Sequence, residues 1–350
     1  MKFKKIKKLS REKLSLKTRK GFFRLDKNER ISDFRNTIFN KIKLSSFDLT
    51  AYPETGKVYK SISKFFKIDN KNIIVIPGSE FGYRVCLEYF NNKKKKIISL
   101  NPTFGMIEVY SRLFNIQRLD IGYDKNFELK FDLLLKNISS KISLIILANP
   151  NSPTGTILEK KKIFKILEKA KKKNIPVLID EAYNGFYNFS YLKFIKKYKN
   201  LLVLRTFSKS FGLAGLRAGF LATNKNMAQE LSKYKPMYEI NSIACKVVNY
   251  LLNNKKISKN YISETIKGKK YFEEELKRLK IPFLKTYANF IHIDLKNKKK
   301  AIEKDLLKNK ILTRKGPGVK GFESYLRITL GPTKFMKKVI LILKKYENYF

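Results

Sequence analysis

The chain has 350 residues, 43% of them hydrophobic, which is enough for one large α/β domain with or without a smaller one and excludes wholesale disorder. Lys and Arg number 77 against 29 Asp and Glu, a net charge of +48, but no run of about 18 apolar residues predicts a membrane span. Two cysteines and one histidine exclude a metal site built from thiols and imidazoles, so we expect no metal, reduced cysteines and a cytoplasmic protein.

From about residue 60 to 235, short apolar segments alternate with longer helical patterns. The expected strands, each buried on both faces, are 72–78, 96–100, 142–150, 176–183 and 201–207. Residues 160–174 have apolar side chains at helical spacing and a charged outer face, which predicts a helix. Repeated β-α-β order predicts an α/β fold whose central sheet is mostly parallel, with helices on both faces.

After residue 235 the pattern changes. Long helical patterns lead into NFIHIDL (289–295) and YLRITL (325–330), which predict a smaller α+β domain. His292, the lone histidine, lies in the first of these strands and is expected to be structural. We therefore expect an N-terminal arm and part of the small domain at 1–35, a large domain at 36–235 and the small domain at 236–350.

Polar clusters follow four of the expected strands. They are Gly78-Ser79-Glu80, Asn149-Pro150-Asn151, Asp180-Glu181 and Thr206 to Lys209. Open α/β sheets bind ligands beyond the carboxyl ends of their strands, so these clusters predict one shared site.

Lys209 differs from the many other lysines in its surroundings, TFSKSFGLAGLRAG (206–219). Hydroxyl donors, glycines that allow close backbone approach and one cation accompany it: Thr206, Ser208, Gly212, Gly215 and Arg217. Such a set suits a phosphate. A nucleophilic amine must lose its proton or be stored as an imine, so a lysine beside a phosphate site suits a phosphorylated aldehyde. The segment alone is equally compatible with a loop that carries an exposed lysine.

Asp180 favours the first interpretation. It ends an apolar strand, where a carboxylate needs a partner. An anion there would keep a basic ring nitrogen protonated and make the ring an electron sink, as pyridoxal phosphate requires. Tyr183 could donate to the 3-oxygen of the same ring. A helix cap at Asp180 and a packing role for Tyr183 are the structural alternatives.

Several motifs in order resemble a known family. They are NPTFGMIEVY (101–110), NPNSPTGT (149–156), DEAYNGF (180–186), RTFSKSFGLAGLRAG (205–219) and YLRITLG (325–331). From about residue 22 onward the chain resembles the pyridoxal-phosphate-dependent aminotransferases of fold type I, the aspartate aminotransferase superfamily. It is most similar to the histidinol-phosphate aminotransferase branch.

The resemblance implies pyridoxal 5′-phosphate as cofactor and a large domain at 36–235 that binds it. Lys209 resembles the Schiff-base lysine, which also moves the proton between Cα and C4′. Asp180 would pair with the pyridinium nitrogen and Tyr183 with the phenolate oxygen. The implied phosphate contacts are Ser79, Glu80, Thr206, Ser208 and Arg217.

Three further cofactor contacts follow from the resemblance. Phe104 takes the place of the aromatic residue that stacks on the ring, usually a tyrosine. Tyr52, in AYPETG, resembles the tyrosine that reaches the phosphate of the neighbouring subunit, which implies a homodimer. Asn151 is assigned to the 3-oxygen of the ring, although Ser152 stands directly before Pro-Thr-Gly, where the branch often has asparagine.

Two arginines match substrate positions of the branch. Arg327 matches the arginine that clamps the substrate α-carboxylate, and Arg314 matches one near the distal phosphate. The early segment RLDKNERI (24–31) departs from the branch at Arg30 and Ile31.

The function expected is ping-pong transamination between an amino donor, such as histidinol phosphate or a related phosphorylated or aromatic amine, and a 2-oxo acid. A decarboxylase of the threonine-phosphate type is the alternative, because local sequence poorly separates the two reactions. A polyanion-binding protein is a third. We expect no specific nucleic-acid binding, because the lysines are spread along the chain and only about 20 residues precede the resemblance, too few for a DNA-binding domain.

Overall fold

The computed structural model describes residues 18–124 and 127–350, so most of the basic N-terminal arm expected at 1–35 lies outside the described residues. Within that part of the chain, seven strands form a large sheet in the order β2-β8-β7-β6-β5-β3-β4. Their bounds are Ile73–Ile76 (β2), Lys96–Asn101 (β3), Gln117–Gly122 (β4), Ile142–Ala148 (β5), Val177–Asp180 (β6), Leu201–Thr206 (β7) and Gly219–Ala222 (β8). Only β8 runs antiparallel to its neighbours among these strands.

The mostly parallel sheet is confirmed, and so are the five strands expected from the apolar segments. β4 and β8 were not expected. β4 reads QRLDIG and is mostly half-buried, so it lacks the apolar run of a central strand, and β8 reads GFLA, a short segment that begins with glycine.

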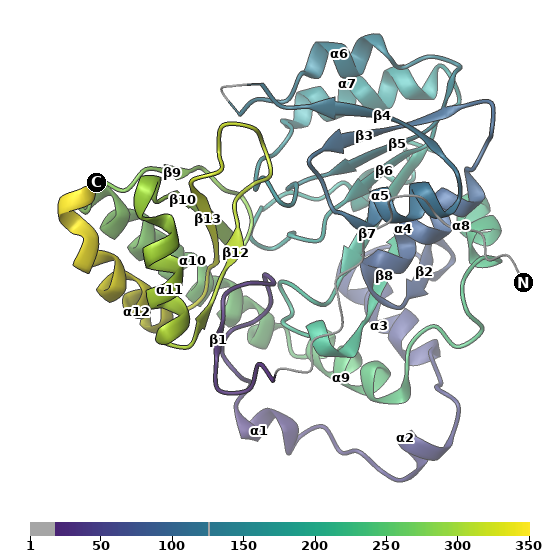
Figure 1. Ribbon diagram of the computed structural model, residues 1–350. Helices are drawn as coiled ribbons and strands as arrows, with labels where there is room; N and C mark the ends of the chain where they lie inside the picture. The colour runs from purple at the N-terminus through teal and green to yellow at the C-terminus, as the bar shows by residue number, and fades with distance from the viewer. Residues whose placement is uncertain (1–17, 125–126) are drawn as a thin grey trace, which may run out of the picture.

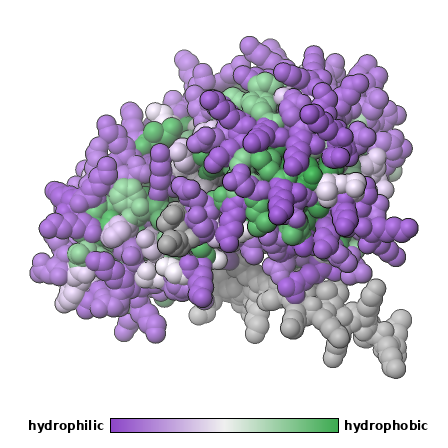
Figure 2. All heavy atoms as spheres, turned by 90° about the horizontal axis from the view of Figure 1, so that it is seen from above, coloured by the Kyte–Doolittle hydropathy of each residue, from purple (hydrophilic) through white to green (hydrophobic). Residues whose placement is uncertain are grey.

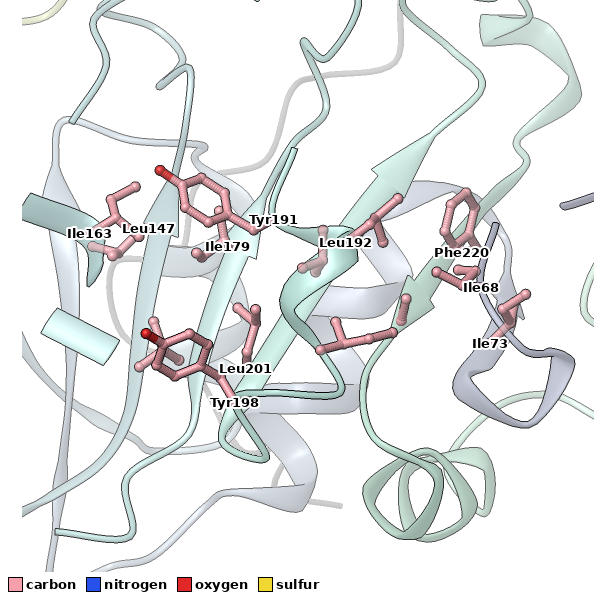
Figure 3. Packing of buried hydrophobic residues seen from close by; sticks show 14 of the residues in the cluster. Ile68, Ile73, Leu147, Ile163, Ile179, Tyr191, Leu192, Tyr198, Leu201 and Phe220 are labelled. Carbon is pink, nitrogen blue, oxygen red and sulfur yellow. The ribbon is translucent and has the colours of Figure 1, made fainter. Parts of the chain in front are cut away.

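Helices cover both faces of this sheet, as expected. They are α3 (Gly56–Phe66), α4 (Gly78–Tyr89), α5 (Met106–Leu113), α6 (Phe131–Lys136), α7 (Lys160–Lys171), α8 (Lys225–Ser232) and α9 (Ser242–Asn253). Alternate strand residues point to opposite faces. One face packs on α3, α6, α7 and α9, and the other on α4, α5 and α8. Figure 3 shows Leu147, Ile179 and Leu201, from three neighbouring strands, packed with Tyr191 and Tyr198 in the first of these cores.

A second unit lies beside the large sheet (Figure 1). Its strands are β9 (Phe283–Leu284), β10 (Phe290–Asp294), β12 (Arg314–Lys315) and β13 (Tyr325–Thr329), antiparallel in the order β12-β13-β10-β9. Helices α10 (Lys255–Arg278), α11 (Lys299–Lys308) and α12 (Thr333–Leu343) cover one side. The side chains of Ile291, Ile293, Leu326 and Ile328 face these helices in a core of their own.

The N-terminal segment runs between the two units. β1 (Phe23–Arg24) pairs in parallel with β11 (Ile311–Leu312) of the second unit. The short helices α1 (Asn36–Phe39) and α2 (Phe47–Thr50) follow, in a segment that extends from the body of the molecule along the lower edge of Figure 1. Helix α9 lies beyond residue 235 and yet packs on the large sheet. The boundary between the large and small domains expected at residue 235 stays a prediction. Among the described residues, none of the helices combines the length and the apolar character that crossing a membrane requires.

Candidate active site

The polar segments that follow the strands meet at one edge of the large sheet. β2, β5, β6 and β7 run in the same direction, so their carboxyl ends share that edge. Contacts link the segments: Arg217 pairs with Glu80, and Tyr83 binds Asp180. The ammonium group of Lys209 lies 5.8 Å from the centre of the Tyr183 ring. The structure therefore brings together side chains that follow β2, β6 and β7.

Lys209, just beyond β7, is held by backbone carbonyl groups of the N-terminal segment. Its Nζ donates to the oxygens of Lys27 (3.0 Å) and Asn28 (2.9 Å). Burial is the main reason that the pKa of Lys209 is lowered, and the charge of Arg327 lowers it further, while Tyr183 acts in the opposite sense. A lysine with a lowered pKa is closer to the unprotonated form that an amine nucleophile needs.

Asp180 ends β6 with its carboxylate buried. The Tyr83 hydroxyl donates to Oδ2 (2.5 Å), and the backbone N–H of Ala182 donates to Oδ1 (2.8 Å). Burial raises the pKa of Asp180 to about 6, and the neighbouring Glu181 adds to this, while the hydrogen bonds and the charge of Lys209 oppose it. A carboxylate so placed is stabilised by any cation brought to it, which is what a protonated ring nitrogen supplies.

Tyr183 lies three residues further on, with its hydroxyl oriented by Asn28. The amide Nδ2 of Asn28 donates to the phenolic oxygen (3.0 Å), and the Tyr183 ring packs edge-on against Phe290. Asn28 is itself bound to Thr329 through its backbone N–H (3.0 Å) and its side-chain oxygen (3.3 Å). The phenol therefore has a fixed orientation beside Lys209.

A cradle for an anion lies at the start of α4. This helix begins at Gly78 without a side-chain cap, so its first backbone N–H groups have no partner within the helix. Nη1 of Arg217 donates to Ser208 Oγ (3.5 Å), and its Nη2 lies 3.8 Å from Glu80. Gly78 has φ +75°, and a Cβ there would lie 2.9 Å from Arg217 Nη2, so only glycine admits this approach.

Thr206 shapes the turn that carries these groups. Its hydroxyl oxygen accepts from the backbone N–H of Ser208 (3.1 Å) and lies 3.5 Å from the carbonyl oxygen of Ala218. Amides, hydroxyls and a guanidinium thus converge within reach of Lys209 and Asp180. The residues present fit a phosphorylated aldehyde with a basic ring nitrogen.

In the loop 149–156, the side chain of Asn151 is hydrogen-bonded within the protein. Nδ2 of Asn151 donates to Pro102 O, Tyr123 OH and Thr154 Oγ1, and its Oδ1 accepts from Thr103 (2.8 Å). Asn151 is buried, whereas its neighbour Ser152 is partly exposed. The amide of Asn151 is thus occupied by protein partners, and its assignment to the cofactor ring stays a prediction, with Ser152 as the alternative.

His292 anchors the same loop from the second unit. Its Nε2 donates to the carbonyl oxygen of Pro153 (2.6 Å), and its buried Nδ1 has no hydrogen-bond partner among the described residues. Burial lowers the pKa of His292 to about 4, so the ring is neutral. The structural role expected for this residue agrees with that geometry.

One face of the small sheet covers the site. His292, on β10, and Arg314, on β12, both lie directly opposite Arg327 of β13, so the three side chains share a face. Nη2 of Arg327 donates to the carbonyl oxygen of Asp26 (2.8 Å), and its buried Nε finds no hydrogen-bond partner within residues 18–124 and 127–350. The pKa of Arg327 is lowered chiefly by burial and also by the charge of Arg314. Two arginines side by side favour a substrate with more than one anionic group.

The two remaining aromatic residues differ in exposure. Phe104 is 36% exposed, and the centre of its ring lies 5.7 Å from that of Tyr83, which binds Asp180. Tyr52 is 74% exposed and stacks on Tyr238 (4.2 Å). Phe104 therefore lies next to the site, whereas Tyr52 lies on a surface segment of the same chain.

Comparison with known proteins supports this chemistry. The profile of the aminotransferase class I and II family matches residues 29–341. The chain belongs to this family.

The histidinol-phosphate aminotransferase of Clostridium novyi (strain NT) is 35% identical over 334 residues, which cover 93% of this chain and 92% of the relative. The crystal structure of the histidinol-phosphate aminotransferase from Clostridium acetobutylicum matches with a TM-score of 0.83 at 24% identity, over 94% of this chain and all of that chain. The crystal structure of L-threonine-O-3-phosphate decarboxylase from Porphyromonas gingivalis matches with a TM-score of 0.77 at 21% identity, over 92% of this chain and 98% of that chain. These two structures share the fold.

The chain is thus a pyridoxal-phosphate-dependent aminotransferase of fold type I and of the histidinol-phosphate aminotransferase branch, as its motifs predicted. The structure adds two site residues that the sequence did not single out. Asn28 binds Tyr183 and Lys209, and Tyr83 binds Asp180. Asn28 lies in RLDKNERI, a motif noticed only for its departures, and nothing in the sequence marked Tyr83.

Proposed function

We propose that this aminotransferase exchanges an amino group between a phosphorylated or aromatic amino donor, histidinol phosphate first among them, and a 2-oxo acid of the 2-oxoglutarate type. The observation that carries the proposal is the pair formed by Arg314 and Arg327, directly opposite on β12 and β13. Two guanidinium groups on one face of neighbouring strands suit substrates that carry more than one anionic group. In a ping-pong reaction both substrates use one site, so the same pair serves the carboxylates of one and the phosphate of the other.

The chain's own residues have distinct tasks in this proposal. Bound pyridoxal phosphate supplies a ring that withdraws electrons from the substrate Cα. Asp180 keeps the proton on the ring nitrogen, and Tyr183, oriented by Asn28, donates to the ring oxygen. Arg217, Ser208 and the first amides of α4 bind the phosphate. Lys209 takes the proton from the substrate Cα and delivers it to the neighbouring cofactor carbon.

The proposal includes a homodimer in which Tyr52 reaches the phosphate site of the neighbouring subunit. Exposed apolar side chains gather on the α1–α2 segment and on the segment it touches through the Tyr52–Tyr238 stack. They are Phe39, Leu44, Phe47, Leu49, Tyr52, Met237 and Tyr238. Such a concentration on a largely charged surface is typical of a protein interface.

Mixed dimers test the shared site. A dimer of one Lys209→Ala subunit and one Tyr52→Ala subunit has one site in which both residues are intact. We expect activity to return when the Lys209→Ala and Tyr52→Ala proteins are mixed and allowed to exchange subunits. No recovery, in a mixture shown to contain heterodimers, would contradict the sharing of Tyr52.

Decarboxylation is less well supported than transamination. The decarboxylase shares the fold at 21% identity, whereas the relative matched at 35% carries the aminotransferase name. Release of carbon dioxide, measured beside formation of the 2-oxo product, separates the two reactions. Hydrophilic side chains cover most of the face shown in Figure 2. Polyanion binding is not part of the proposal, because the lysines are spread along the whole sequence. We also propose a cytoplasmic location, which accords with the free, buried thiols of Cys86 and Cys245.

The decisive experiment combines one variant with a substrate screen. Lys209→Ala should abolish both turnover and the visible absorbance of lysine-bound cofactor, while Lys172→Ala, an exposed lysine after α7, should change neither. Single-turnover reactions with a panel of amino donors, including histidinol phosphate, identify the donor by its loss of that absorbance. Retained turnover in Lys209→Ala would refute the role of the lysine.

A further inference from the structure

Tyr83 is a buried phenol that none of the roles above uses. It lies on α4, in the helical turn after the phosphate cradle, and its side chain is 0% exposed. Its hydroxyl is 2.5 Å from Asp180 Oδ2, and the centre of its ring lies 5.7 Å from that of Phe104. The phenol therefore binds Asp180 from a fully buried position on α4.

The neighbouring glycine explains how α4 comes so close. A Cβ at Gly82 would lie 2.3 Å from Leu204 Cδ1 and 2.9 Å from Ile76 Cδ1, so any larger residue would push the helix from the sheet. Since β7 carries Leu204 beside Asp180 of β6, the close contact at Gly82 brings Tyr83 to the carboxylate. Gly82 and Tyr83 thus act together.

The surroundings of Asp180 give this contact a chemical consequence. Burial and the charge of Glu181 favour the protonated acid, while the Tyr83 hydrogen bond is the largest opposing influence on the pKa of Asp180. The other titratable groups whose charges act on Asp180 or Tyr83 from the packed elements are Cys86, Tyr183, Arg205 and Lys209. Burial and the Asp180 charge raise the pKa of Tyr83, so its hydroxyl keeps its proton and remains a donor.

We infer that Tyr83 is a positioning residue that fixes the Asp180 carboxylate and keeps it ionised opposite the ring nitrogen of pyridoxal phosphate. The inference rests on the pairing of Asp180 with that nitrogen in the proposed function. The Tyr83 hydrogen bond leaves Oδ2 a second lone pair, so the carboxylate would still be able to accept from the ring N–H. A protonated Asp180 could not stabilise a charged ring.

Tyr83→Phe tests this role with the ring volume unchanged. A hydrogen bond to a charged group corresponds to at least about a tenfold change in an ionisation equilibrium. We expect the variant's Asp180 to bind its proton about tenfold more tightly, measured by carboxyl NMR titration of cofactor-free protein. Because the pKa of Asp180 is about 6, the variant's affinity for pyridoxal phosphate should fall about tenfold near pH 5 but only about twofold near pH 7, and it should recover as the pH is raised further.

Tyr191→Phe is the matched control. Tyr191 is also a buried tyrosine, 1% exposed, but its hydroxyl has no hydrogen-bond partner in the part of the chain that the structure describes. Loss of this hydroxyl should therefore leave the Asp180 titration unchanged. In an Asp180→Asn background, Tyr83→Phe should no longer alter cofactor affinity, because the ionisable partner is gone.

An unchanged Asp180 titration in Tyr83→Phe would overturn the inference, and so would an equal loss of affinity in the Asp180→Asn background. A wild-type protein that fails to bind pyridoxal phosphate would refute the proposed function and remove the partner on which the inference depends. The two failures are distinct, because the carboxyl titration needs no cofactor.

Discussion

The side-chain amide of Asn28 donates to the phenolic oxygen of Tyr183 at 3.0 Å, across 155 positions of sequence. The carbonyl oxygen of Asn28 also accepts from Lys209 at 2.9 Å. One residue of the N-terminal segment thus orients a phenol and holds an ammonium group at the ends of two strands.

Asn28→Ala should therefore weaken both fold and site. The substitution leaves the buried hydroxyls of Tyr183 and Thr329 without the amide, and an unpaired buried polar group costs about 1–3 kcal/mol. We expect a loss of that size in the free energy of unfolding, measured with denaturant, and a lower kcat. Asn28 has φ 54°, so Asn115→Ala, at an exposed asparagine with the same φ, controls for backbone strain. Equal effects of the two variants would contradict the role of the side chain.

The role of Asn28 also shows what could be predicted from sequence. Parallel strands put their carboxyl ends at one edge, so Asp180 and Lys209 could be assigned to one site from strand order alone. Five central strands were predicted because each is a continuous apolar run.

Contacts between distant segments follow from tertiary packing and have no local signal. Asn28 reaches Tyr183 because β1 pairs with β11 and carries the N-terminal segment to the site. Tyr83 reaches Asp180 because Gly82 permits close packing. In the same way, the network around Asn151 joins it to Thr103 and Tyr123, which nothing in NPNSPTGT indicates.

The buried Asp180 should make the free energy of unfolding of the cofactor-free protein depend on pH. Its pKa is about 6 in the folded chain against 3.8 as the ordinary value, so the folded state binds the extra proton between these limits. The resulting stabilisation is present below about pH 4 and is lost as the pH rises through about 6. Cofactor-free Asp180→Asn should be more stable than wild type at neutral pH, by up to about 3 kcal/mol, and equal to it at low pH. Denaturant titrations across this range test the sign, and a wild type that is the more stable at neutral pH would refute it.

His292 should make stability depend on pH in the opposite direction. Its pKa is lowered from 6.5 to about 4, mainly by burial, so the unfolded chain binds the proton first as the pH falls. Its contribution to stability is present above about pH 6.5 and is lost as the pH falls through about 4. Because the chain has one histidine, its imidazole NMR signals are unambiguous and should stay in the neutral position until about pH 4. A midpoint near the ordinary value would mean that the ring is solvated and that its bond to Pro153 does not persist.

Substitutions at Arg327 and Arg314 should raise KM for different substrates. Arg327 is packed over Phe290 and bound to Asp26, so its guanidinium is fixed, whereas Arg314 is exposed on the edge strand β12. Lysine keeps the charge but cannot make a bidentate contact, which corresponds to a loss of about tenfold to a hundredfold. Arg327→Lys should raise KM for the 2-oxo acid by this factor, and Arg314→Lys should raise KM for the phosphorylated amino donor more than for an unphosphorylated one. Arg112→Lys, at an arginine that pairs with Glu108 on α5, is the control and should change neither constant. If Arg314→Lys raised KM equally for donors with and without phosphate, Arg314 would not be the residue that selects a phosphorylated substrate.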